Sequence, residues 1–247
     1  PKTEICILEL GMSHTGEIDK LSEISSPNIS IITNIGPAHI SNFNSQKDIA
    51  IEKSDIFKHS SNGISLVPRD CDFFEILSKK ASISCQNNFS FGFNKNSDFQ
   101  VVALKRYKKG KINVIVRLLD EKANFFCNDI GNHWVLNRLL VLSVSKILGL
   151  NISELIPKIS QLEPEDGRGK LKKIMFKRKQ IYLFDDSYNS NPLSLRASLN
   201  TLKKISLKNV KRKICVIGDM LELGNDSEYL HKEMVHSIVS AKPSIVY

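Results

Sequence analysis

The sequence lacks the features of a disulfide-rich, zinc-binding or membrane-spanning protein. Its five cysteines are odd in number and follow no metal-ligand spacing, which indicates reduced thiols. No apolar run approaches the roughly 20 residues of a membrane-spanning helix, and the first residues form no signal-peptide pattern. We therefore expect a cytoplasmic protein without a membrane span.

A phosphate-binding loop of the form G-x-x-x-x-G-K-[ST] is also missing. The two Gly-Lys pairs of the chain, at 110–111 and 169–170, are followed by Ile and Leu. Such a loop holds nucleotide phosphates through its backbone N–H groups and its lysine. The chain contains no substitute for it that the sequence reveals.

Basic residues outnumber acidic ones, and the formal net charge is +9. Lys and Arg gather in "GKLKKIMFKRKQ" (169–180) and "KNVKRK" (208–213). These clusters match no nucleic-acid-binding module, so we expect no nucleic-acid partner. An anionic substrate such as a nucleotide suits the same charge.

Strand-like and helix-like segments alternate along the first ninety residues, which predicts a parallel sheet covered by helices. The continuous apolar run "EICILEL" (4–10) predicts a strand buried on both faces, beside a second strand at 28–36. The other predicted elements are a strand at 63–68 and helices at 16–26, 45–60 and 72–81, with Ser45 as N-cap.

The pattern changes after about residue 90. Alternating polarity over 98–130, broken at "KKGK", predicts antiparallel hairpins. A long helix stopped by Gly149 follows, and then a short helix over 151–162 that we expect Pro157 to interrupt. "EPEDGRGK" (163–170) is the clearest linker, and we expect a domain boundary near Gly167.

Beyond the linker, βαβ order resumes. The expected elements are a buried strand at 180–186, a helix at 191–205, a strand at 211–219, a helix at 228–241 and the start of a strand at 243–247. The predicted fold class is thus α/β, with a central domain at 1–167 and a second, truncated Rossmann-like domain at 168–247.

Polar residues follow the predicted strands at the edge where parallel α/β sheets bind ligands. Glu9 follows the first strand and could hold Mg²⁺, or be an ordinary solvated carboxylate. Asn34 and His39 follow the second, and a lone histidine is as consistent with a structural role. Lys53 shares a predicted helix face with two isoleucines, where its ammonium group must reach water or find a partner.

The stretch "DDSYNSNP" (185–192) follows the apolar run "IYLF". Asn191 and Pro192 form a good helix start, with a capping amide followed by proline at the first helical position. A helix cap does not account for the four polar residues before them.

Five motifs occur in order along nearly the whole chain and together resemble the Mur ligase family. They are "LELGMSHTGEI", "ITNIGPAHISNFNSQKDIAIEKSDIF", "DGRGKL", "LFDDSYNSNPLSLRASL" and "IGDMLELG" with a later Ser and His. The last two are most similar to members that add D-alanyl-D-alanine to a UDP-N-acetylmuramoyl-tripeptide. The resemblance implies a Mur-type ATP-binding domain followed by a Rossmann-like ligase domain.

The resemblance also implies roles for single residues. Glu9, His39 and Lys53 would hold Mg²⁺, with Lys53 carbamylated, and Lys53 and His39 would thereby serve catalysis. Asn34 would be a further contact to the nucleotide.

Three further residues would contact ATP, one in the motif "GNHWVLN" (131–137) and two in the later motifs. Asn137 would contact the adenine, Arg168 the phosphates and Asp186 the ribose, so Arg168 would also take part in catalysis. One departure is Trp134, which stands where the family usually has Asn; an indole can stack on a base but accepts no hydrogen bond.

The implied activity is ATP-dependent amide formation through an acyl phosphate, with UDP-N-acetylmuramoyl-tripeptide and D-alanyl-D-alanine as substrates, in a monomer. The family's phosphate loop and UDP-sugar domain are expected before residue 1, and the rest of the last domain after residue 247. Another Mur-type or polyglutamate-type ligase, or a non-catalytic remnant, stays open as an alternative.

Overall fold

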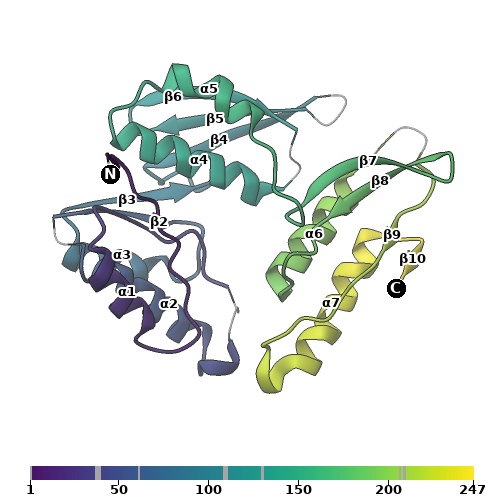
Figure 1. Cartoon of the computed structure of the whole chain (residues 1–247), viewed down its shortest axis with the longest axis horizontal. Helices are drawn as coiled ribbons and strands as arrows, with labels where there is room; N and C mark the ends of the chain where they lie inside the picture. The colour runs from purple at the N-terminus through teal and green to yellow at the C-terminus, as the bar shows by residue number, and fades with distance from the viewer. Residues whose placement is uncertain are drawn as a thin grey trace. The chain divides into compact units, whose positions relative to one another are not determined.

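The computed structural model divides the chain into two compact units, residues 1–98 and 99–247 (Figure 1). The structure describes residues 2–36, 40–60, 62–107, 111–128, 131–205, 207 and 210–247.

The first unit is built on three parallel strands in the order β1-β2-β3. Their bounds are β1 Ile29–Ile31, β2 Ile64–Pro68 and β3 Asn87–Gly92. Helix α1 Glu17–Ser25 precedes β1, and the helical segments between the strands are η1 Ile40–Asn42, α2 Gln46–Ser54, η2 Asp55–Phe57 and α3 Phe74–Ser84. The predicted parallel sheet covered by helices is confirmed for this part of the chain.

The helices of this unit begin and pack as their sequences predict. The Ser45 side chain accepts a hydrogen bond from the Asp48 N–H at 3.2 Å and caps α2. Ile49 of α2, Phe57 of η2 and Leu77 of α3 are almost completely buried in one hydrophobic core. Burial of these apolar faces holds the helices on the sheet.

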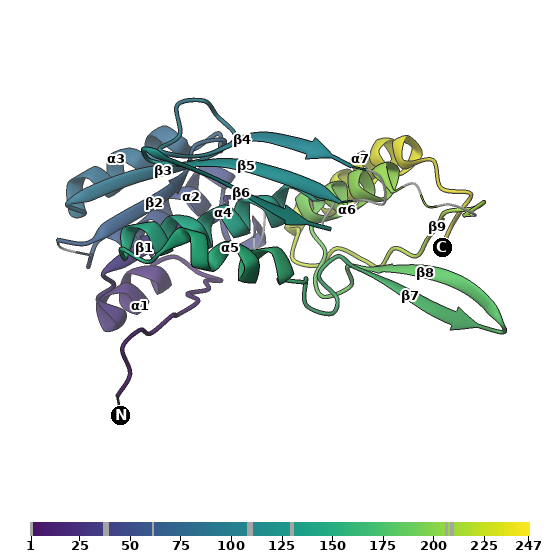
Figure 2. The same cartoon turned by 90° about the horizontal axis from the view of Figure 1, so that it is seen from above.

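The predicted first strand at 4–10 is wrong. Residues 2–12 form no strand, and Ile7 and Leu8 are 89% and 60% exposed. The segment runs away from α1 as an extended trace (Figure 2). A strand requires backbone pairing along an edge and cover on its faces. Among the described residues no strand pairs with this segment, so Ile5, Ile7 and Leu8 lie in solvent, and only its end at Leu10 and Met12 packs against the core.

The second unit begins with an antiparallel meander, as the alternating sequence predicts. Its strands are β4 Phe99–Arg106, β5 Ile112–Leu118 and β6 Glu121–Cys127. Alternate residues of β5 are buried, and helix α4 (Asn132–Ile147) packs against β4 and β5. The "KKGK" turn begins at 108–110, which lie outside the described residues.

Helix α5 (Ile152–Gln161) runs through Pro157, so the expected interruption is wrong. Proline removes its own N–H donor from the helix, and its ring crowds the carbonyl group four residues earlier. Ile152 and Ile159, on either side of it, are 3% and 4% exposed and pack the helix against the unit. Tertiary burial on both sides of the proline outweighs the local loss.

The strand predicted at 180–186 is not buried. It forms β8 (Lys179–Asp185), which pairs antiparallel with β7 (Lys170–Phe176) in a two-stranded arm (Figure 2). Ile181 and Leu183 are 41% and 44% exposed. In the described structure the hairpin has no third strand to extend it, so apolar residues on both of its faces stay open.

The remaining elements form a small α/β layer. They are α6 Pro192–Lys204, β9 Ile214–Cys215, η4 Gly224–Asp226, α7 Ser227–Ala241 and β10 Ile245–Val246. Strands β9 and β10 are parallel, and Leu199, Cys215 and Ala241 form a core between the helices and the strands. No helix in the described part of the chain has the length and apolar character needed to cross a bilayer.

Candidate nucleotide-binding site

The first turns of α4 present the polar residues of its motif. Val135 and Leu139 are buried and hold the helix against the meander, while His133 and Asn137 face solvent. Trp134 is half-buried, and its ring centroid lies 5.4 Å from that of His133. The apolar stripe therefore fixes the helix so that these polar and aromatic groups point outward.

Two glycines allow the linker to run close to this helix. Gly167 and Gly169 have φ values of +77° and +82°. Residues that carry a side chain rarely adopt this left-handed backbone conformation, whereas glycine adopts it readily. A Cβ atom at Gly169 would lie 3.4 Å from Nε1 of Trp134. The Gly169 N–H donates to the Asp185 carbonyl at 2.7 Å, so this part of the linker is tied to the end of β8.

The "DDSYNSNP" segment is a helix cap and also contacts the linker, since the Tyr188 N–H donates to the Gly167 carbonyl at 3.0 Å. Asn191 and Ser194 form a capping box at the start of α6. Asp186 accepts a hydrogen bond from Ser198 of α6, which fixes its carboxylate. The Arg168 guanidinium lies 4.0 Å from the centroid of the Tyr188 ring, against the same segment.

His133 and Asp186 are brought close enough to interact electrostatically. Partial desolvation lowers the pKa of His133 below its ordinary value, and the negative charge of Asp186 opposes this shift without cancelling it. The imidazole is therefore neutral near pH 7 and can both donate and accept a hydrogen bond.

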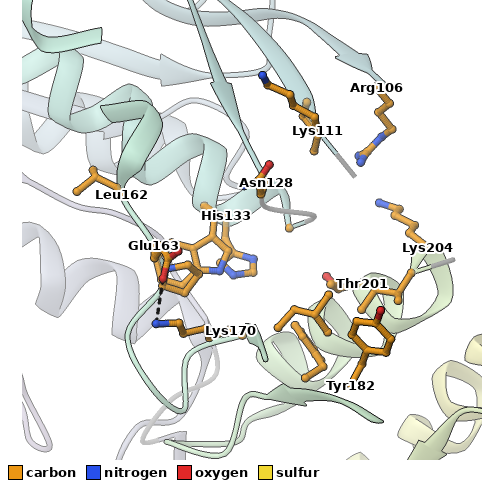
Figure 3. A pocket seen from close by; sticks show the side chains of 18 of the residues that line it. Arg106, Lys111, Asn128, His133, Leu162, Glu163, Lys170, Tyr182, Thr201 and Lys204 are labelled. Atoms are coloured by element: carbon orange, nitrogen blue, oxygen red, sulfur yellow. Dashed lines mark ion pairs between the residues drawn. The ribbon is translucent and has the colours of Figure 1, made fainter. Parts of the chain in front are cut away.

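A cavity of about 1030 Å³ opens between α4, the linker and the hairpin (Figure 3). Its wall includes aromatic groups of Trp134, Tyr182 and Phe184, together with His133. Arg106 and Lys204 line it from other elements. Flat rings and cations are the groups that hold a nucleobase and phosphates.

Asn137, Arg168 and Asp186 do not line this cavity; Trp134, Gly169 and Phe184, from the same segments of the chain, do. The structure does not test the roles of Asn137, Arg168 and Asp186, which stay predictions.

Lys53 and Asn34 lie together in the first unit. Nζ of Lys53, in the last turn of α2, is 3.5 Å from the Asn34 carbonyl oxygen. Partial burial lowers the pKa of Lys53, and nearby Cys71 acts weakly in the opposite direction. A lowered pKa increases the fraction of neutral amine, the form that reacts with CO₂.

The other predicted metal ligands are less well defined. Glu9 is exposed in the segment that forms no strand, and His39 lies outside the described residues. In the described ranges, no cluster of three His, Cys, Asp or Glu side chains could hold a metal ion. The Mg²⁺ site therefore stays a prediction.

Sequence reasoning missed Arg138, which is 3% exposed within α4. Its guanidinium donates to the carbonyls of Ile159 at 3.2 Å, Trp134 at 3.3 Å and Leu162. A charged residue inside the otherwise apolar stripe of α4 was the signal that could have revealed it.

Comparison with known proteins gives two family matches. "Mur ligase middle domain" matches residues 1–145, and "Mur ligase, glutamate ligase domain" matches residues 172–247. Both matches agree with the motif resemblance found in the sequence.

Curated relatives carry one name. The UDP-N-acetylmuramoyl-tripeptide–D-alanyl-D-alanine ligase of Rickettsia prowazekii is 34% identical over 99% of this chain and 53% of its own length. That of Bacillus subtilis is 31% identical over 94% of this chain and 48% of its own length. The chain spans about half the length of the curated relatives it matches.

Solved structures agree with these matches. MurF from Acinetobacter baumannii has a TM-score of 0.84 at 26% identity, covering 97% of this chain and 50% of that protein. MurF from Thermotoga maritima in complex with ADP has a TM-score of 0.78 at 23% identity, over 95% of this chain and 56% of that protein. The predicted α/β fold class is confirmed.

Proposed function

Since the chain belongs to the Mur ligase family, we propose that it is part of an ATP-dependent ligase that adds D-alanyl-D-alanine to a UDP-N-acetylmuramoyl-tripeptide in peptidoglycan precursor synthesis. The names of the curated relatives support this substrate pair. We also propose domains at 1–167 and 168–247, a cytoplasmic location and a monomeric state.

The observation that carries the nucleotide part of this proposal is the meeting of α4 with the "DDSYNSNP" segment. The electrostatic influence of Asp186 on His133 supports a close approach of the two segments, beside a cavity that His133 and Trp134 line. Asp186, fixed by Ser198, would accept hydrogen bonds from the ribose hydroxyls. Asn137 would contact the adenine, against the ring of Trp134.

Arg168 would act on the reacting phosphate groups, and Lys53 would act as a ligand of the metal ion. In the proposed reaction the tripeptide carboxylate attacks the γ-phosphate of ATP, and ADP leaves with the electron pair of the broken P–O bond. The amine of D-alanyl-D-alanine then attacks the acyl phosphate, and phosphate leaves. Negative charge gathers in both steps, and the fixed guanidinium charge of Arg168 would stabilise it.

Two of the three proposed donors of the first unit, the Glu9 carboxylate and a carbamate on Lys53, supply the oxygen ligands that Mg²⁺ prefers, whereas the His39 imidazole is a softer nitrogen donor. Glu9 supplies a carboxylate and His39 an imidazole, and the lowered pKa of Lys53 suits carbamylation, which turns its amine into an oxygen ligand. We propose these three residues as ligands, with Asn34 beside them. When bound, the ion would neutralise phosphate charge.

A second candidate is a nucleotide-binding remnant without ligase activity. The absence of G-x-x-x-x-G-K-[ST] from all 247 residues favours it for this chain alone. A different Mur-type or polyglutamate-type ligase is the remaining alternative, and the names of the relatives make it the weaker one.

Trp134 allows a direct binding test, because it is the only tryptophan of the chain. Titration with ADP should change its fluorescence, and Asp186→Ala should weaken ADP binding roughly tenfold or more by removing hydrogen bonds to a charged group. Asp226→Ala, an exposed carboxylate outside the site, is the matched control. Equal ADP affinity in wild type and Asp186→Ala would contradict the proposed nucleotide site.

Ligase activity needs its own assay. Phosphate release with ATP, the tripeptide precursor and D-alanyl-D-alanine should be undetectable for this chain and present in a ligase that contains it together with a phosphate loop. Turnover by the chain alone would refute the remnant. If this chain binds no ADP and the ligase that contains it with a phosphate loop shows no activity, both candidates are refuted.

A further inference from the structure

Three cations gather on the wall of the cavity away from Glu163 and His133 (Figure 3). Arg106 ends β4, Lys111 precedes β5, and Lys204 ends α6. Arg106 and Lys111 lie at neighbouring ends of the paired strands β4 and β5, whereas Lys204 is distant from both in sequence, so only the fold brings it to the same cavity. None of them belongs to the motifs that carry the family resemblance.

The charge of this wall is not balanced within the cavity. The lining holds four cations, Arg106, Lys111, Lys170 and Lys204, and one carboxylate, Glu163. Lys170 and Glu163 form an ion pair at 3.0 Å, which leaves three positive charges. In the part of the chain that the structure describes, no carboxylate pairs with these three. Like charges held at one concave surface repel each other and attract anions.

Local contacts explain the place of two of these cations but do not neutralise them. Nζ of Lys111 lies 4.5 Å from the centroid of the Phe126 ring, and Lys204 lies in the last turn of α6, where the helix dipole favours a cation. Neither a ring face nor a partial dipole charge replaces a counter-anion.

We propose that Arg106, Lys111 and Lys204 form a second anion-binding subsite that takes a diphosphate group, apart from the phosphates of the catalytic nucleotide. The word "second" rests on the proposed function, in which Arg168 contacts the phosphates of ATP. Arg168 does not line this cavity. A fork of N–H donors and two ammonium groups match the several oxygens of a diphosphate.

The ligand could carry a planar ring as well. Tyr182 and Trp134 line the same cavity and offer ring faces for stacking. Free diphosphate and a nucleoside diphosphate thus share the anchoring chemistry, and the test separates them by comparing inorganic pyrophosphate with ADP.

The experiment uses the whole chain and titrates inorganic pyrophosphate by calorimetry, with Trp134 fluorescence recorded in parallel. The double variant Lys111→Ala/Lys204→Ala should weaken pyrophosphate binding by roughly a hundredfold, since each charged contact is worth about tenfold. Lys203→Ala is the matched control, because its ammonium group donates instead to Ser240 at 2.9 Å. Higher salt should weaken binding further.

A second arm distinguishes this proposal from the nucleotide site. Pyrophosphate that still binds when ADP is saturating, and that is retained in Arg168→Ala, supports a separate subsite. Pyrophosphate that is lost in Arg168→Ala but not in the double variant overturns the subsite and leaves the ATP proposal standing. Displacement of pyrophosphate by ADP that survives in Asp186→Ala identifies a nucleoside diphosphate as the ligand of the subsite, whereas displacement that is lost in Asp186→Ala overturns the subsite. Absence of pyrophosphate binding also overturns the subsite, whatever ADP does.

Discussion

Arg138 provides the sharpest test of how the site is held together. Its buried guanidinium connects three carbonyl groups: Trp134 in the first turn of α4, Ile159 in α5, and Leu162 at the start of the linker. It thereby joins the wall that carries the aromatic ring to the base of the linker. We predict that Arg138→Met destabilises the second unit.

The magnitude follows from these contacts. Three hydrogen bonds from a charged donor contribute about 1.5 kcal/mol or more each, and burial of the charge offsets part of that sum. The substitution also leaves buried carbonyl groups without this donor. We expect a net loss of about 3 kcal/mol in the free energy of unfolding, which at an m-value of about 3 kcal/mol per molar shifts the urea midpoint by about 1 M.

Urea unfolding followed by Trp134 fluorescence measures this effect, because the reporter is itself one of the residues that Arg138 contacts. Arg196→Met makes the same chemical change at an exposed position of α6 and should leave the free energy of unfolding within about 0.5 kcal/mol of wild type. Arg138→Lys keeps the positive charge but loses the planar guanidinium with its several N–H donors. Its urea midpoint should therefore lie between those of Arg138→Met and Arg196→Met. If Arg138→Met unfolds like Arg196→Met, the bridging role is refuted.

Further predictions concern protonation and capping. The pKa of His133 in the folded chain is below its ordinary value of 6.5, so between these two pKa values the unfolded chain binds more protons than the folded chain. The stability that the neutral imidazole contributes is therefore complete above pH 6.5 and decreases as the pH falls below 6.5. The free energy of unfolding in urea should therefore be lower at about pH 5 than at about pH 7.5. His133→Gln should reduce this difference between the two pH values, and an unchanged difference would contradict the prediction. Lys53 has a lowered pKa, so ¹³C-bicarbonate should yield a carbamate NMR signal that Lys53→Arg abolishes, and a signal that persists would exclude Lys53. Asn191→Ala removes the α6 cap and should cost about 1 kcal/mol in thermal unfolding; Asn189→Ala, an exposed neighbour outside the capping box, is its control.

Local sequence was sufficient where neighbours along the chain determine the structure. The caps at Ser45 and Asn191 depend on hydrogen bonds within one turn, and both are present. The alternation over 98–130 predicted the antiparallel meander for the same reason, because one face of each strand is buried. The motifs also identified the family, which the family matches confirm.

Local sequence failed where pairing partners decide. The run at 4–10 has strand composition, yet its residues form no strand, and the strand at 179–185 is exposed instead of buried. Apolar composition states what a segment can bury, whereas burial requires a second surface that composition does not provide. Pro157 is the opposite case, since burial of α5 retains a helix that local propensity would break.

The candidate site shows the same division. The chain by itself provided the predicted site residues, because Lys53, Arg168 and Asp186 stand in motifs whose order and spacing resemble those of the family. Only the tertiary structure decided what lies beside them: it set Asp186 near His133, fixed the linker through Arg138, and collected cations from three elements into one cavity. Contacts between residues distant in sequence leave no periodic pattern in the chain, so they become visible only once the chain is folded.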